Sequence, residues 1–149
     1  MYKVAALYKF TKILDPFKIH NNIRSKLKNH NVNGTILVGE EGINGTISSN
    51  SRNNLDKAIE FISKLEGFKN LEVKYSFSEK NPFIRLKVKL KKEIVTIGDT
   101  SVDPTKIVGE YVSPAEWNEL IDNKDTIVID TRNNYEYSIG TFKNSLNPE

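Results

Sequence analysis

Residues 85–93 read RLKVKLKKE, and cationic and apolar side chains alternate along this stretch. Side chains of a β-strand point alternately to opposite faces. As a strand, the stretch would have one apolar face and one cationic face, the latter formed by Arg85, Lys87, Lys89 and Lys91. A row of cations can follow a phosphate backbone and bind it in a salt-dependent way with little sequence information. The alternative is an edge strand whose lysines prevent aggregation.

The distribution of charge along the chain favours a polyanionic partner. The 149 residues carry a net charge of +3. Residues 1–97 contain 18 Lys/Arg against 9 Asp/Glu, a balance of +9, whereas residues 98–149 contain 4 against 10, a balance of −6. A change of sign at one point indicates two modules, of which the first is suited to a nucleic acid.

A second candidate site is the glycine-rich stretch VGEEGING at residues 38–45. Its two adjacent carboxylates would repel an anion, and no Lys-Ser/Thr pair follows, so a phosphate-binding P-loop is excluded. We interpret the stretch as a tight hairpin whose glycines adopt positive φ angles. A ligand-facing or interdomain loop is the alternative. The residues concerned are Gly39, Glu40, Glu41, Gly42, Asn44 and Gly45.

A third candidate follows the apolar run at residues 127–129, where Asp130 and Arg132 begin a polar loop. Open α/β sheets place functional side chains at the carboxyl ends of their strands. The preferred interpretation is nevertheless structural, namely an Asp–Arg pair that fixes the loop.

The chain has no cysteine and two histidines. The absence of cysteine excludes disulfides, thiolate metal ligands and a cysteine nucleophile within the chain. His20 and His30 are expected at the surface of one helix, so we predict no metal site and no visible cofactor. No apolar stretch approaches the roughly 18–20 residues of a membrane span, and no signal peptide precedes the first strand. We therefore expect a cytoplasmic protein without a membrane partner.

The elements that would position these residues follow the order β-α-β-β-α-β. This order is typical of the ferredoxin-like fold, an α+β fold with a four-stranded antiparallel sheet and both helices on one face. The cationic row would lie on the other face. The expected elements are a strand at 3–10, a helix at 17–30, strands at 35–38 and 46–48, a helix from Ser51 that Gly67 ends, and strands at 71–77 and 83–95.

A linker at residues 98–110, rich in Gly and Pro, separates this domain (1–97) from a second module at 111–149. The second module opens with a helix in which Ser113 and Glu116 form a capping box and Pro114 is the first helical residue. We expect Trp117, Leu120 and Ile121 to form the buried stripe of this helix, and residues 126–130 to form the strand after it.

The C-terminal stretch IVIDTRNNYEYSIGTFKNSLNPE resembles the first signature of rhodanese-like domains. Together with GTILVGEEGINGTIS and EIVTIG, it makes the whole chain resemble the rhodanese-related tRNA uridine hydroxylase family. The resemblance implies a basic, acylphosphatase-like N-terminal domain of ferredoxin-like fold, followed by the incomplete start of an α/β rhodanese-like domain. The implied activity is conversion of uridine to 5-hydroxyuridine at the tRNA wobble position, with O2 as co-substrate and tRNA as partner.

One feature departs from the family pattern. The active cysteine of the family belongs to a later strand and loop, so we expect a truncated family member and assign no catalytic residue; Asp130, Arg132, Asn133 and Glu136 match the rhodanese loop only as scaffold. The phosphate loop of true acylphosphatases is also absent after the first strand. The alternatives are a non-catalytic tRNA-binding remnant or, for a full-length parent, rhodanese-type sulfur transfer. No oligomeric state is predicted.

Overall fold

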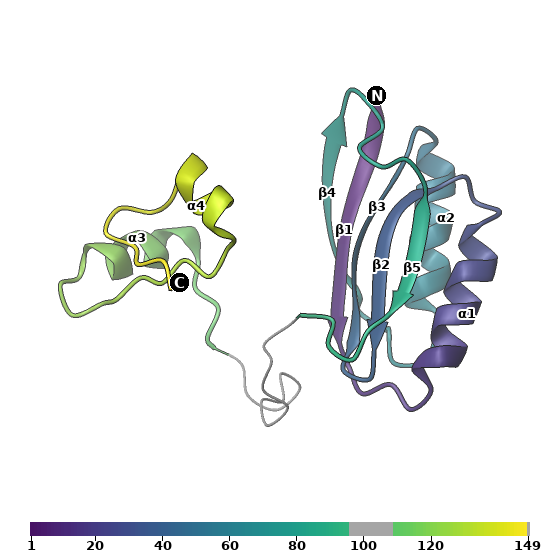
Figure 1. Ribbon diagram of the computed structural model, residues 1–149, viewed down its shortest axis with the longest axis horizontal. Helices are drawn as coiled ribbons and strands as arrows, with labels where there is room; N and C mark the ends of the chain where they lie inside the picture. The colour runs from purple at the N-terminus through teal and green to yellow at the C-terminus, as the bar shows by residue number, and fades with distance from the viewer. Residues whose placement is uncertain (96–108, 149) are drawn as a thin grey trace. The chain divides into compact units, whose positions relative to one another are not determined.

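The computed structural model describes residues 1–95 and 109–148. The chain divides into two compact units, Met1–Val108 and Gly109–Glu149, and each is described by itself (Figure 1). Most of the predicted linker, residues 98–108, lies outside the described residues.

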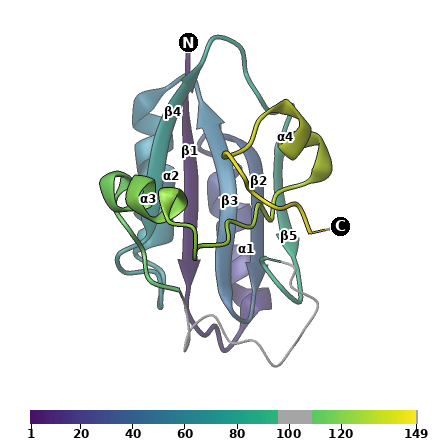
Figure 2. The ribbon, with the colours of Figure 1, turned by 90° about the vertical axis from the view of Figure 1, so that its left-hand side faces the viewer.

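The first unit has the predicted β-α-β-β-α-β order and then the further predicted strand, which is shorter than the expected range of 83–95. Its sheet is ordered β4-β1-β3-β2-β5, with α1 and α2 on one face (Figure 2). The four strands of the predicted fold are antiparallel, but β5 pairs parallel with β2, so the sheet is mixed. The elements are β1 (Tyr2–Phe10), α1 (Pro16–Leu27), β2 (Asn33–Gly39), β3 (Gly42–Ser49), α2 (Arg52–Ser63), β4 (Glu72–Ser78) and β5 (Leu86–Leu90).

The core lies between the sheet and the two helices. Asp15 caps α1 by accepting a hydrogen bond from the Lys18 amide at 2.8 Å, and Ser51 caps α2 in the same way from the Asn54 amide at 3.3 Å. Apolar residues at helical spacing then face the sheet, and strand residues at spacing two meet them. The fully buried members are Ala5, Leu7, Ile23, Leu27, Ile36, Val38, Ile43, Ile47, Leu55, Ala58, Ile62 and Phe68.

The fifth strand explains why the expectation for the histidines was wrong. His20 is buried, with 9% of its surface exposed, and its Nε2 donates to the carbonyl oxygen of Val88 in β5 at 3.1 Å. Because β5 extends the sheet beneath α1, it covers a helix face that a four-stranded sheet would leave in solvent.

His30 lies outside α1, which ends at Leu27. The second helix likewise ends at Ser63, four residues before Gly67.

The connection of residues 79–85 joins β4 and β5, which are the two opposite edges of the sheet. It therefore passes across one end of the sheet, as both views show (Figures 1 and 2). Asn81 ties it to the sheet, because its Oδ1 accepts hydrogen bonds from Ser48 Oγ in β3 at 3.0 Å and from the Phe83 amide at 3.2 Å.

The second unit contains α3 (Pro114–Asp122) and α4 (Asn134–Ile139). The capping box between Ser113 and Glu116 is confirmed. The predicted strand at 126–130 is not formed: among the described residues, its only β-pairing is one parallel bridge between Ile129 and Leu146. A ladder requires a neighbouring strand along its length, and the described residues of this unit supply a single partner position.

The predicted buried stripe on α3 is also wrong, because no residue of α3 is buried. Trp117 and Ile121 are half-buried and Leu120 is 39% exposed. The buried residues of the described part of this unit are Val128, Asp130 and Ser145, two of them polar. So few residues cannot enclose an apolar helix face, which is the general difficulty of very small units.

Candidate nucleic-acid interface

The two central lysines of the cationic row, Lys87 and Lys89, lie on the sheet face opposite α1 and α2, which we call the outer face. Leu86 and Val88 of β5 pack against the hydrophobic core. Lys87 and Lys89 alternate with them and therefore point to the outer face, while Arg85 and Lys91 flank the strand at its two ends. All four cationic side chains are exposed.

The strand register shows what surrounds the row. Lys87 and Lys89 pair with Thr35 and Leu37 of β2, so uncharged side chains are their nearest neighbours across the outer face. Glu72, the carboxylate on the outer face of β4, belongs to the opposite edge of the sheet and accepts a hydrogen bond from Tyr8 Oη at 2.5 Å. Lys87 and Lys89 therefore have no acidic side chain paired with them across the outer face.

No ion pair involves Arg85, Lys87, Lys89 or Lys91 within residues 1–95 and 109–148. Successive cations along one face of a strand are about 6.6 Å apart, and their charges add to one local field. Such a row can exchange its counterions for phosphates. Because β5 is an edge strand, the aggregation-guard interpretation fits the same position, and only a binding measurement separates the two.

The predicted glycine-rich hairpin is formed, and its three glycines do not share one conformation. Gly42 has φ +140°, and a Cβ there would lie 2.0 Å from the carbonyl oxygen of Lys9. Gly39 and Gly45 do not have positive φ, so the prediction was wrong for these two. A Cβ on Gly45 would lie 2.5 Å from the Thr35 carbonyl oxygen, so this glycine permits close approach of the strands.

The polar residues of the hairpin hold neighbouring chain segments. Glu41 Oε1 accepts a hydrogen bond from the Ile94 amide at 2.5 Å, and Asn44 Nδ2 donates to the Ile94 carbonyl oxygen at 3.3 Å. The carbonyl oxygens of Glu40 and Glu41 accept from the amides of Ile13 and Thr11, at 2.7 and 2.9 Å. These two amides follow the first strand, and the hairpin engages both of them.

The loop after Ile129 contains the predicted Asp–Arg pair. Asp130, 9% exposed, receives two hydrogen bonds from the Arg132 guanidinium, Nε to Oδ1 at 2.9 Å and Nη2 to Oδ2 at 2.6 Å. The Arg132 amide and Thr141 Oγ1 also donate to this carboxylate, at 3.1 and 2.8 Å. Arg132 Nη2 reaches the Gly140 carbonyl oxygen at 2.7 Å. The pair thus joins both ends of α4.

Asn133 and Glu136 form the N-terminal cap of α4. The Glu136 carboxylate accepts from the Asn133 amide at 3.2 Å and from Asn133 Nδ2 at 2.7 Å. The first of these bonds satisfies a backbone donor at the helix N-terminus, and the second ties the two side chains together. Both residues therefore shape the loop, and their role as scaffold of a rhodanese-like domain stays a prediction.

Acidification should destabilise the second unit through Asp130. The hydrogen bonds from Arg132 and then Thr141 hold the pKa of its carboxyl well below the usual value. Since the folded pKa is depressed, the ionised form stabilises the fold at neutral pH, and this contribution is lost as pH falls below the unfolded value of about 3.9.

The single tryptophan, Trp117, contacts Phe142 in this unit at 5.1 Å between ring centroids and can report the change. We expect its fluorescence to show a transition below about pH 4. An Asp130→Asn variant should show the acid-like signal already at pH 7. Identical pH profiles for the parent and the variant would contradict this prediction.

Within 1–95 and 109–148, no three His, Cys, Asp or Glu side chains come together as metal ligands. In the same ranges, no helix has the length and apolar character needed to span a membrane.

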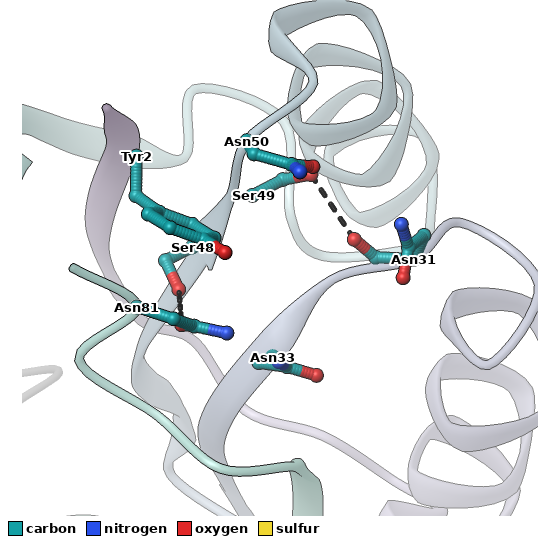
Figure 3. Close-up of a pocket in the computed structure, with 7 residues that line it drawn as sticks. All are labelled: Tyr2, Asn31, Asn33, Ser48, Ser49, Asn50 and Asn81. Carbon is teal, nitrogen blue, oxygen red and sulfur yellow. Dashed lines mark hydrogen bonds between the residues drawn. The ribbon is translucent and has the colours of Figure 1, made fainter.

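The sequence reasoning missed a polar pocket at the end of the sheet where β2 begins and β3 ends (Figure 3). Asparagine and serine form most of its lining, from stretches that read NHNVN and SSNS in the sequence. The clustering of asparagines in these two stretches was the feature of the sequence that could have indicated the pocket. It was overlooked because asparagine in such stretches also indicates ordinary turns.

The fold and the candidate interface define a ferredoxin-like α+β domain with a cationic row at one edge of its outer face. A family model described as the UPF0176 acylphosphatase-like domain matches residues 2–94, and the chain belongs to this family. A curated relative, the tRNA uridine(34) hydroxylase of Bartonella quintana (strain Toulouse), is 44% identical over 147 residues, covering 99% of this chain and 48% of the relative. The chain thus spans about half the length of this relative.

Two solved structures are similar in fold. A bacterial light-regulated adenylyl cyclase is 16% identical with a TM-score of 0.51, over 70% of this chain and 32% of that chain. The dark-state structure of BlrB, a BLUF protein, is 17% identical with a TM-score of 0.51, over 62% of this chain and 75% of that chain. At these identities the likeness concerns the fold alone.

Proposed function

We propose that this chain is the RNA-binding half of a tRNA uridine hydroxylase that converts the wobble uridine to 5-hydroxyuridine with O2 as co-substrate. The observation that carries the proposal is the 44% identity to the tRNA uridine(34) hydroxylase along nearly the whole chain. The cationic row supports the RNA-binding role, because Lys87 and Lys89 share the outer face, Arg85 and Lys91 flank them, and none of these four exposed side chains forms an ion pair among the described residues.

The proposed division of labour follows from the residues present. The 149 residues contain no cysteine, so the active cysteine implied by the family resemblance is not part of this chain. Asp130 is engaged by Arg132 and Thr141 and holds the ends of α4 together, which is a structural use of its carboxylate. This chain therefore positions tRNA, and the oxidation of the uridine belongs to the remainder of the hydroxylase.

A second candidate is a tRNA-binding protein without catalysis. The absence of cysteine favours it for the chain taken alone. Formation of 5-hydroxyuridine in tRNA incubated with this chain and O2, read by mass spectrometry of digested nucleosides, would exclude this candidate and would also contradict the division of labour proposed above. Both candidates share the tRNA-binding step.

Binding of unmodified tRNA should be salt-dependent. If all four cations of the row contact phosphates, log K should fall with log salt with a slope of about −3 to −3.5. Fluorescence anisotropy with labelled tRNA between 50 and 300 mM KCl measures this slope. Absence of binding at 50 mM salt and 100 μM protein would refute the proposal, and so would an affinity that salt does not change.

A further inference from the structure

The polar pocket of Figure 3 has a volume of about 240 Å³. It is bounded by the start of β1, the start of β2, the end of β3 and the connection of residues 79–85. Figure 3 shows its side chains placed around a common space, with Tyr2, Ser48 and Asn81 on one side and Asn31 on the other. Ser49 and Asn50 complete the lining together with Asn33.

The pocket walls are fixed, while several polar groups remain available. Ser48 Oγ donates to Asn81 Oδ1 at 3.0 Å, and Ser49 Oγ donates to the Asn31 carbonyl oxygen at 3.0 Å (Figure 3). In contrast, the side-chain amides of Asn33 and Asn50 have no hydrogen-bond partner within residues 1–95 and 109–148. Each of these amides offers two donor hydrogens and one acceptor oxygen.

These groups define the chemistry of a ligand. No charged side chain lines the pocket, so a phosphate or carboxylate has no counter-charge there. Amide side chains match the alternating donors and acceptors at the edge of a nucleobase, and the half-buried ring of Tyr2 offers an aromatic surface beside them. The volume is below the roughly 300–1,000 Å³ of drug-sized sites, which suits a single heterocycle.

The pocket also lies next to the cationic row. Asn33 and Ser48 are directly paired in the β2–β3 ladder and point to the outer face. The following amide, Gly34 N, donates to the Arg85 carbonyl oxygen at 3.1 Å. The row therefore begins on the strand beside Asn33. The phosphate backbone of an RNA bound by the row is within reach of the pocket.

We propose that this pocket binds one unstacked base of the RNA whose phosphates contact the cationic row. Single-stranded RNA is generally recognised through bases that leave the stack and form hydrogen bonds along their edges. The inference rests on the proposed tRNA-binding function and adds a base-binding site to it. The row supplies salt-dependent affinity, and the pocket discriminates a base from a bare backbone.

The test compares a uridine hexanucleotide with an abasic hexanucleotide of equal charge, using the full chain and anisotropy at 50 mM KCl. The parent should bind the uridine oligomer about tenfold more tightly, since a base contact contributes roughly this much. An Asn33→Ala/Asn50→Ala variant should lose the preference and keep the salt slope. Because neither amide bonds to the described protein, its melting temperature should match that of the parent within a few degrees.

A matched control is Asn22→Ala/Asn53→Ala, which removes two exposed amides from α1 and α2 and should keep the preference. If tRNA itself is not bound by the parent, both the proposed function and this inference fail. If tRNA is bound with the expected salt slope but the two hexanucleotides bind equally, the pocket inference alone fails. A preference retained by the Asn33→Ala/Asn50→Ala variant also overturns it.

Discussion

Charge reversal at two positions of the row, Lys87→Glu/Lys89→Glu, should weaken tRNA binding about 30-fold at 0.1 M salt. Each phosphate contact adds roughly 0.7–0.9 to the steepness with which log K falls against log salt. Losing two contacts makes the slope shallower by about 1.5, which at 0.1 M salt lowers log K by about 1.5. Repulsion by the new carboxylates adds to this loss. Both side chains are exposed and outside the core, so the fold should tolerate the change.

The matched control is Lys18→Glu/Lys57→Glu, which changes the net charge equally on α1 and α2, at the opposite face of the sheet. Both lysines are exposed. The control should bind tRNA within about threefold of the parent, because long-range repulsion is screened within about 10 Å at 0.1 M salt. Equal losses of tRNA affinity in the two variants would mean that binding depends on the net charge of the protein and not on the row. Unchanged binding by the row variant would leave the aggregation-guard interpretation in place.

The largest effect on stability is expected for Gly42→Ala in the hairpin. Its φ of +140° is strained for any residue with a Cβ, and the added atom would lie 2.0 Å from the Lys9 carbonyl oxygen. Strained backbone and overpacking each cost about 1–3 kcal/mol, so we expect a loss of about 3 kcal/mol or more. In a unit of this size the melting temperature should fall by at least about 12 °C.

Thermal unfolding followed by far-ultraviolet circular dichroism measures this shift. Gly140→Ala is the control, because nothing lies within 4 Å of the Cβ it would add and its φ of 169° is ordinary extended backbone. It should change the stability by less than about 0.5 kcal/mol. A Gly42→Ala variant as stable as this control would show that the hairpin relaxes freely.

The sequence was sufficient to predict most of the first unit, for physical reasons that particular residues make plain. Asp15, Ser51 and Ser113 cap helices with their own side chains, so helix starts are encoded locally. The alternation of residues 85–91 likewise determines which side chains of β5 face the core. Local capping and side-chain periodicity do not depend on the rest of the chain.

The features that escaped prediction depend on segments distant in sequence. The parallel pairing of β5 with β2 joins residues about fifty positions apart and buries His20, which its own helix would leave exposed. The close approach of Gly45 to Thr35 and the pocket around Asn33 likewise exist only after the strands meet. In the second unit, an apolar run predicted a strand, but a strand also requires a partner along its length.

The connection of residues 79–85 has a minimum length, because it must reach from one edge of the sheet to the other. It must bridge four inter-strand spacings, roughly 19 Å, because it joins opposite edges of the sheet. Its eight Cα–Cα steps reach at most about 28 Å when extended, so the slack amounts to two or three residues. Insertions here cost little loop entropy, whereas a larger deletion would detach β5 together with its cations. In folding, β5 can add to the sheet only after β2 is in place, so the cationic row forms no earlier than that strand.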